Sequence, residues 1–207
     1  MRILGLDEAG RGCVLGDLVV GAFCCDESER DLVVATGATD SKKLSRKKRE
    51  SIREKLLQIG ENRLISITPA EIDAGNLNRL EEAAFIDHII HFNPDLVIID
   101  APAHPKAIPA IVSRMKAEVT IALGRCPEFK VEPKADLTYP ICGAASIFAK
   151  VDRDQKIDAL GPVGSGYPSD PKTRAWLTGF FEREEPLPDC VRKRWGSIRK
   201  LRQKSLL

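Results

Sequence analysis

The 207-residue sequence contains no long hydrophobic run, no C-x-x-C pair and no linker-like stretch, and each absence excludes a class of protein. The longest apolar stretches, such as Leu96–Ile99, are far too short to cross a bilayer, and the N-terminus lacks a signal-peptide pattern. Six cysteines without a C-x-x-C pair argue against a zinc site or a disulfide framework, and predict small, buried, reduced side chains. We therefore expect one cytoplasmic globular unit without a membrane segment.

The net charge is also small, at +2, so the total does not point to nucleic acid, but the charges are unevenly placed. Seven Lys or Arg and no acid follow Val191, and a second basic run spans residues 42–49. Two basic blocks beside a set of acids fit a protein that holds phosphates while chelating a metal. The charge pattern alone fits two solvated helix faces equally well.

Hydrophobic periodicity predicts an α/β protein in which strands come first and helices then accumulate. Ser45 is a good N-cap for one helix, in which Ile52, Leu56 and Ile59 would share a buried face. The apolar run Asp95–Asp100 predicts a strand buried on both faces. The expected strands are Arg2–Leu6, Val14–Cys25, Arg63–Thr68, Asp95–Asp100 and Phe129–Glu132, and the expected helices are Ser45–Ile59, Leu80–His91, Ala107–Lys116, Ala144–Leu160, Lys172–Glu184 and Val191–Lys204.

Four acids stand at or near the ends of these elements: Asp7, Glu8, Asp100 and Asp136. If they converge, two carboxylates about 4 Å apart repel by roughly 4 kcal/mol at an effective dielectric near 20, so the four acids would partly protonate unless cations lay between them. Mg²⁺ and Mn²⁺ prefer such oxygen ligands, and two of them can activate a water and stabilise the leaving oxygen of a phosphodiester. Each acid taken alone could equally be a cap or a turn residue.

The turn Gly10-Arg11-Gly12 follows the first acid pair. Glycines on both sides of Arg11 let the backbone approach a sugar or phosphate closely. A G-x-G sequence is by itself also common in hairpin turns. The three histidines do not add a metal site, because His88 and His91 lack a third local ligand and His104 lies elsewhere.

Several motifs, in order, resemble those of ribonuclease HII, the type 2 ribonuclease H, in its archaeal form. The first is the opening Met1–Gly12, which ends in Asp-Glu-Ala-Gly-Arg-Gly. The others are Asp40–Leu44, Ile98–Asp100, Lys134–Asp136, Ala144–Val151 with Arg153 and Asp154, and Gly164–Pro171. Together they span nearly the whole chain.

The resemblance implies a ribonuclease H-like mixed sheet flanked by helices, with a core over about residues 1–160 and a helical substrate-binding region over about 161–207 of one catalytic unit. It implies an endonuclease that cuts RNA in RNA–DNA hybrids and single ribonucleotides in duplex DNA, on the 5′ side, leaving a 3′-hydroxyl and a 5′-phosphate. Such an enzyme would act as a monomer in DNA replication and ribonucleotide excision repair.

By the same resemblance, Asp7 would bridge two metal ions, Asp136 would help hold the ion that activates water, and Glu8 with Asp100 would hold the other. The turn Gly10-Arg11-Gly12 and Tyr167 would read the 2′-hydroxyl, the group by which a protein tells RNA from DNA. Candidates for phosphate contacts are Lys42, Lys43, Ser146, Lys150 and Arg153. Ser146 and Lys150 would share a helix face, whereas Arg153 could equally form a salt bridge.

Gly143, Cys13 and Asp17 depart from the family pattern, which commonly has Ser at the first position and often proline at the other two. They bear on substrate contacts, since none is an expected metal ligand. The C-terminal Gln203 and Leu206 resemble the start of a sliding-clamp-binding box, whose aromatic pair is absent. The alternative is that they are simply the end of a basic helix.

Three other functions compete with this interpretation. A non-catalytic binder of nucleic acid would bind hybrids without Mg²⁺ and would not cleave them. The type 3 ribonuclease H shares the catalytic core but carries an N-terminal DNA-binding domain, and here the acids begin at residue 7. A metal-dependent DNA nuclease of the same superfamily is disfavoured by the glycine turn and Tyr167.

Overall fold

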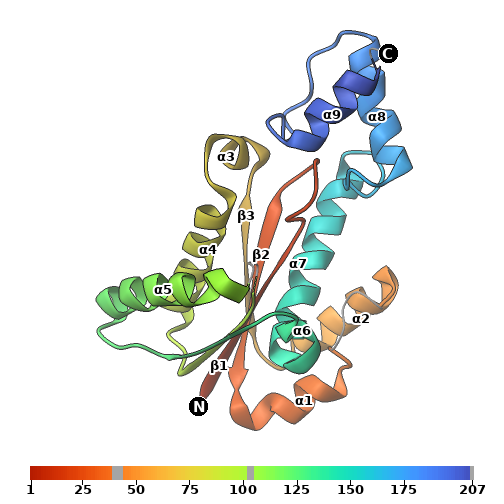
Figure 1. Ribbon diagram of the computed structural model, residues 1–207. Coiled ribbons are helices and arrows are strands. Elements are labelled where there is room, and N and C mark those ends of the chain that lie inside the picture. Colours follow the sequence, from red (N-terminus) through yellow and green to blue (C-terminus); the bar gives the residue numbers. More distant parts are fainter. Residues whose placement is uncertain (39–43, 102–104, 206–207) are drawn as a thin grey trace.

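The computed structural model describes residues 1–38, 44–101 and 105–205, and these ranges form a mixed sheet with helices on both faces (Figure 1). The strands are β1 (Arg2–Ala9), β2 (Leu18–Asp26), β3 (Glu61–Ile67), β4 (Leu96–Asp100) and β5 (Glu128–Glu132). The helices are η1 (Glu27–Glu29), α1 (Arg30–Ala35), α2 (Arg46–Leu56), α3 (Pro69–Ala74), α4 (Leu77–Phe92), η2 (Pro105–Ala107), α5 (Ile108–Leu123), α6 (Ala135–Thr138), α7 (Pro140–Ala159), α8 (Pro171–Glu182) and α9 (Gly196–Ser205). The predicted α/β class is confirmed.

The strand order is β3-β2-β1-β4-β5, with β1 at the centre. β1 runs antiparallel to β2 and parallel to β4, with Leu6 opposite Ala22 on one side and Ile99 on the other. β4 and β5 are also parallel, so β1, β4 and β5 all end at the same edge of the sheet. Side chains that follow Leu6 and Ile99 are therefore placed next to one another.

Helix α7 crosses one face of the sheet so closely that two strand positions must be glycine. A Cβ atom on Gly5 would overlap the Ile141 carbonyl, and one on Gly21 would overlap that of Ala145. The apolar cluster on this face includes residues of α1, α2, α6 and α7, and the cluster on the other face those of α4 and α5. The close packing of α7 fixes the height of its side chains above the end of β1.

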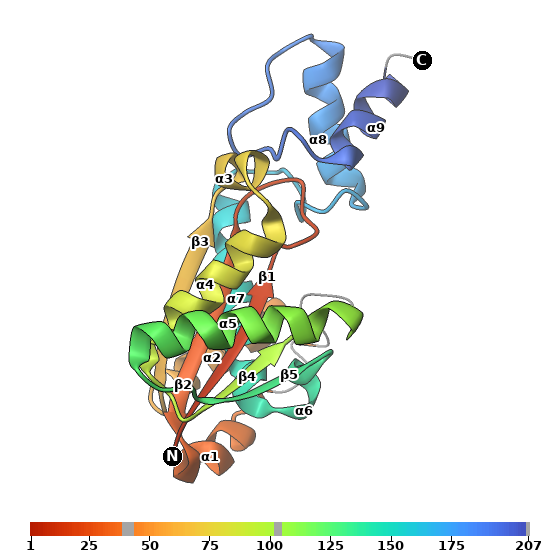
Figure 2. The ribbon, with the colours of Figure 1, turned by 60° about the vertical axis from the view of Figure 1, so that its left-hand side comes forward.

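Helices α8 and α9 lie at one end of the molecule, beyond the C-terminal end of α7 (Figures 1 and 2). They share a third apolar cluster with Val14 and Leu15 of the β1–β2 connection, and with Ile157 of α7. None of the described helices is both long enough and apolar enough to span a membrane. All six cysteines are free; four are buried as expected, whereas Cys126 is exposed and Cys190 is half-buried.

Several predicted boundaries were wrong. β1 extends past Leu6 to Ala9, while the residues from Val14 to Asp17 form a loop, because Gly16 has a φ of 75° and Leu15 forms a bridge with Val191. That bridge also keeps residues 191–195 out of α9. The N-cap prediction is confirmed, since Ser45 accepts a hydrogen bond of 3.3 Å from the Lys48 amide.

Candidate metal centre and nucleic-acid cleft

Three predicted acids meet at the shared edge of the sheet. Asp7 follows Leu6 on β1, Asp100 is the last residue of β4, and Asp136 lies in the short helix α6. Each offers a carboxylate oxygen, and these oxygens lie within 4.8 Å of one another. We call these three residues the acid cluster. Glu8 lies beside it and lines the same cleft.

The acid cluster is poorly hydrated, and this disfavours its negative charge. Asp7 and Asp136 are buried, at 4% and 0% exposure. Burial raises the pKa of Asp7, and it raises the pKa of Asp100 to about 6 together with repulsion from Asp7 and Asp136. Burial and the charge of Asp7 also hold the pKa of Glu8 well above its usual range. A hard divalent cation would relieve this repulsion, and an all-oxygen donor set fits Mg²⁺ or Mn²⁺.

Helix α7 supplies the nearest compensating charge. The Lys150 ammonium lies 3.8 Å from the Asp7 carboxylate and donates a hydrogen bond to the Ser146 hydroxyl, which also contacts Asp7. The predicted shared face of Ser146 and Lys150 is thus confirmed, and it points at the acid cluster. Backbone amides help on the other side, where the Ala135 N–H donates to Asp100 over 3.1 Å.

The residues Gly10–Gly12, here called the glycine turn, border the acid cluster. Gly10 has a φ of 89°, a conformation that favours glycine. The Arg11 guanidinium does not project freely into solvent, because it forms an ion pair with Glu81 and a hydrogen bond with Asn78 on α4. The Arg11 side chain is therefore held against α4 at the border of the cleft.

Tyr167 faces the glycine turn from the loop between α7 and α8. A Cβ atom on Gly12 would lie 3.6 Å from the tyrosine ring, and the Arg153 guanidinium lies 5.0 Å from the ring centre. Burial raises the Tyr167 pKa to about 12, so its hydroxyl stays protonated. The cleft between these groups measures about 320 Å³ and is lined by Asp7, Glu8, Asp100, the glycine turn, Lys150 and Tyr167.

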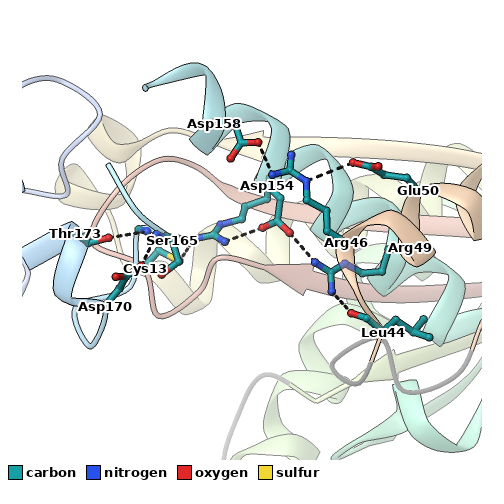
Figure 3. Close-up of polar contacts among 12 residues, drawn as sticks. Cys13, Leu44, Arg46, Arg49, Glu50, Asp154, Asp158, Ser165, Asp170 and Thr173 are labelled. Carbon is teal, nitrogen blue, oxygen red and sulfur yellow. Dashed lines mark hydrogen bonds and ion pairs between the residues drawn. The ribbon is translucent and has the colours of Figure 1, made fainter. Parts of the chain in front are cut away.

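Arg153 is a buried structural arginine rather than an exposed phosphate contact. It pairs with Asp154 over 2.9 Å, and it donates to the Cys13 sulfur and the Ser165 carbonyl. Asp154 also accepts a 2.9 Å bond from Arg49 of α2, so it joins α2 to this network (Figure 3). The salt-bridge alternative for Arg153 is confirmed.

The C-terminal cations are also less free than their sequence suggests. Arg192 is fully buried, Lys193 pairs with Asp189, and Arg194 donates to the Asp73 carbonyl. Arg199 and Lys200 of α9 are exposed. Lys42, Lys43 and Leu206 lie outside the described residues, whereas Gln203 is exposed on α9.

The three departures have local explanations in part. Gly143 is required, because a Cβ atom there would overlap the Ala38 carbonyl. Asp17 pairs with Lys156 over 3.4 Å, and Cys13 is buried against Arg153. None of the three touches the acid cluster through a described hydrogen bond or ion pair.

Sequence reasoning missed Glu81 and Arg192, which hold the glycine turn. Glu81 could have been found, because it stands four residues before Phe85 and eight before Ile89 on the buried face of α4. An acid in that stripe must have a partner. Arg192 gave no such signal, since it lies within a run of cations.

This sheet order, with acids converging at the ends of β1 and β4, defines a metal-dependent hydrolase of the ribonuclease H class. The chain belongs to the ribonuclease HII family, whose model matches residues 4–198. It is 37% identical to the ribonuclease HII of Archaeoglobus fulgidus over 98% of this chain and 97% of that protein.

Two solved structures agree with this assignment. The ribonuclease H2 of Pyrococcus horikoshii superposes with a TM-score of 0.86 at 35% identity, covering 100% of this chain and 99% of that one. The ribonuclease HII in a complex with PCNA from Archaeoglobus fulgidus superposes with a TM-score of 0.83 at 35% identity, with 97% of each chain covered. Because the chain belongs to the ribonuclease HII family, this assignment is favoured over a non-catalytic binder and over a type 3 ribonuclease H.

Proposed function

We propose that this protein is an endonuclease that hydrolyses RNA in RNA–DNA hybrids and at single ribonucleotides in duplex DNA. It cuts on the 5′ side of the ribonucleotide and leaves a 3′-hydroxyl and a 5′-phosphate. The observation that carries the proposal is the acid cluster, whose oxygens lie within 4.8 Å of one another, because Asp7 and Asp100 of this cluster line one cleft with the glycine turn and Tyr167. Carboxylates that could hold metal ions thus lie beside groups that could read a ribose.

The acids and Lys150 would have distinct roles in metal binding and cleavage. Asp7, Asp100 and Asp136, with Glu8 beside them, would hold two Mg²⁺ or Mn²⁺ ions. When bound, such ions activate water for attack on the phosphodiester and stabilise the leaving oxygen. Lys150 would orient Asp7, because its ammonium lies 3.8 Å from the Asp7 carboxylate. No nucleophilic side chain is required.

Recognition of the ribose would come from the glycine turn and Tyr167. Backbone groups of Gly10 and Gly12 can approach a sugar closely, and the protonated Tyr167 hydroxyl can donate to it. Exposed cations such as Lys200 on α9 would hold the duplex by its phosphates, which makes residues 161–207 a substrate-binding region. Lys42 and Lys43 are proposed to act in the same way.

The decisive experiment uses a DNA duplex with one ribonucleotide, incubated with Mg²⁺ or Mn²⁺, and an all-DNA duplex as control. We expect one cut, 5′ of the ribonucleotide, that Asp7→Asn abolishes. No cut, or a cut that survives Asp7→Asn, would refute the proposal. Tyr167→Ala should weaken cleavage at the ribonucleotide more than binding of the all-DNA duplex, and Tyr167→Phe isolates the hydroxyl.

We further propose that the C-terminus binds a sliding clamp through Gln203 and Leu206. Support comes from the exposed position of Gln203 on α9 and from the relative solved in complex with PCNA. Clamp binding of the Gln203→Ala, Leu206→Ala double variant should be weaker than that of the wild-type protein. Gln58→Ala, which changes an exposed glutamine in the turn after α2, is the control. Equal binding by all three proteins would contradict this part.

A further inference from the structure

The β1–β2 connection, which carries the glycine turn, is held by the chain just before α9. The Gly16 amide donates to the Cys190 carbonyl over 2.8 Å, and the Arg192 amide donates to the Val14 carbonyl over 2.9 Å. Leu15 and Val191 form an antiparallel bridge between these bonds. Residues separated by almost the whole sequence are thus paired like two short strands beside the cleft.

The Arg192 side chain extends this pairing to the glycine turn itself. Its Nε donates to the Gly16 carbonyl over 3.0 Å, and its Nη1 donates to the Arg11 carbonyl over 3.1 Å. The guanidinium is 0% exposed and stacks 5.2 Å from the Trp195 ring centre. No carboxylate among the described residues forms an ion pair with it, and its Nη2 has no hydrogen-bond partner there.

Burying an arginine without a carboxylate partner is costly, so its two carbonyl contacts call for a role beyond simple packing. Burial lowers the Arg192 pKa to about 10, which still leaves the side chain charged at neutral pH. A charged donor forms stronger hydrogen bonds to carbonyls than a neutral donor does. The Arg11 carbonyl is therefore held firmly.

The direction of that carbonyl has a consequence for Gly12. In a trans peptide the C=O and the next N–H point in opposite directions, and the Arg11 carbonyl and the Gly12 N–H belong to one peptide. Gly12 lines the acid cleft, and its N–H donates no hydrogen bond to any described residue. Because the Arg11 carbonyl points toward Arg192, the Gly12 N–H points away from Arg192.

We propose that Arg192 is a positioning residue that aims the Gly12 N–H into the cleft, as a donor to the ribose or phosphate at the scissile linkage. The inference rests on the proposed function, because it assigns a role in reading that substrate. By this proposal the residues just before α9 also contribute to recognition of the ribonucleotide, although they lie far from the acid cluster in the sequence.

The test compares Arg192→Met with Arg125→Met in steady-state cleavage of the one-ribonucleotide duplex. Arg125 is a matched control, because it too donates to two backbone carbonyls, those of Asn93 and Pro94, where the chain enters β4 at the other end from Asp100. We expect Arg192→Met to lower kcat by about tenfold or more with KM within about threefold, since phosphate contacts are retained. Arg125→Met should change kcat by less than about twofold.

A second measurement reports on the peptide directly. In protein labelled with ¹⁵N-glycine, the Gly12 amide resonance should shift when the one-ribonucleotide duplex is added in EDTA, where no cleavage occurs. Arg192→Met should abolish that shift, and Arg192→Lys, which keeps the charge but loses the planar fork of donors, should restore part of both the shift and kcat. If Arg192→Met does not fold, the Gly12 shift and the kcat of Arg192→Lys test the proposal instead.

The outcomes distinguish a failure of the proposed function from a failure of the role proposed for Arg192. If the wild-type protein does not cut the duplex, the proposed function fails. If it cuts, but Arg192→Met matches Arg125→Met in kcat, or Arg192→Lys keeps the full kcat and the full Gly12 shift, only the role of Arg192 is refuted.

Discussion

Glu81 forms an ion pair with Arg11, in which the glutamate side chain is 1% exposed and the arginine side chain 27%. Asn78, one turn earlier on α4, accepts a second bond from the same guanidinium. Burial raises the Glu81 pKa to about 7, and the Arg11 charge acts against this rise. The glycine turn is thus tied by its side chain to α4 and by its carbonyl to Arg192.

Glu81→Ala should therefore impair cleavage by releasing Arg11. We expect kcat on the one-ribonucleotide duplex to fall by about tenfold, and stability to fall by about 1–3 kcal/mol, because a charge-assisted hydrogen bond is lost. Glu82→Ala is the matched control, since the neighbouring Glu82 forms two bonds of 2.9 and 2.8 Å with Arg114 and does not contact the turn. A similar loss of stability with an unchanged kcat is expected there. Equal loss of kcat in both variants would show that Glu81 acts only through stability.

Asp100→Asn should stabilise the metal-free protein while abolishing cleavage. The folded pKa of Asp100, about 6, lies above the value of about 3.9 for an unfolded chain, so the folded state binds more protons between these values. The stability that the protonated Asp100 contributes to the folded state is fully present below about pH 4 and is lost as pH rises through about 6. Asn carries no charge and can still accept from the Ala135 N–H. Thermal unfolding in EDTA should give a higher Tm for the variant at pH 8 and little difference near pH 4; a lower Tm at pH 8 would contradict the repulsion.

Lys150→Met should increase the dependence of the fold on divalent metal. The ammonium, 3.8 Å from Asp7, partly offsets the acid cluster, so its removal should lower the Tm in EDTA and enlarge the rise on adding Mg²⁺. Lys156→Met on the same helix removes a lysine that pairs with Asp152 and Asp17 instead. The control should show the wild-type response to Mg²⁺. An equal Mg²⁺ response in all three proteins would show that Lys150 does not compensate the cluster.

The strands and long helices could be predicted because their patterns are local. The apolar run ending at Asp100 and the N-cap Ser45 carry their own signals, and both appear as expected. The short helix α6 gave no such signal, because it has four residues and follows Lys134 at a φ of 63°. Its position is set by packing against α7 and β4, which a local pattern does not contain.

The approach of Asp7 to Asp100 could be expected from residue type and strand ends, but the partners of the cations could not be predicted. Arg11 and Arg192 fit phosphate ligands or solvated charges, and Arg153 fits a phosphate ligand or a salt-bridge partner, since the sequence gives no direction for a long side chain. Each is instead used inside the protein, against Glu81, Asp154 and backbone carbonyls respectively. Tertiary contacts between distant segments decide such roles.

His88 should make the fold sensitive to acid. Its Nε2 lies 3.2 Å from the Val20 carbonyl, and its buried Nδ1 has no hydrogen-bond partner among the described residues. Burial lowers its pKa to about 4, so the folded state holds it neutral while the unfolded chain, with a pKa near 6.5, takes up a proton. The stability it contributes is present above about pH 6.5 and is lost as pH falls toward 4, by up to about 3 kcal/mol.

Denaturant unfolding of His88→Gln between pH 4 and 7 should therefore give a shallower dependence of stability on pH than the wild-type protein. His91→Gln is the control, because His91 is an exposed histidine on the same helix and should keep the wild-type slope. The neutral Gln should lower stability at pH 7, since its amide must replace the imidazole against Val20, but that loss does not change with pH. Parallel curves for wild type and His88→Gln would mean that the acid sensitivity arises elsewhere, and the slope is thus a direct measure of the buried imidazole.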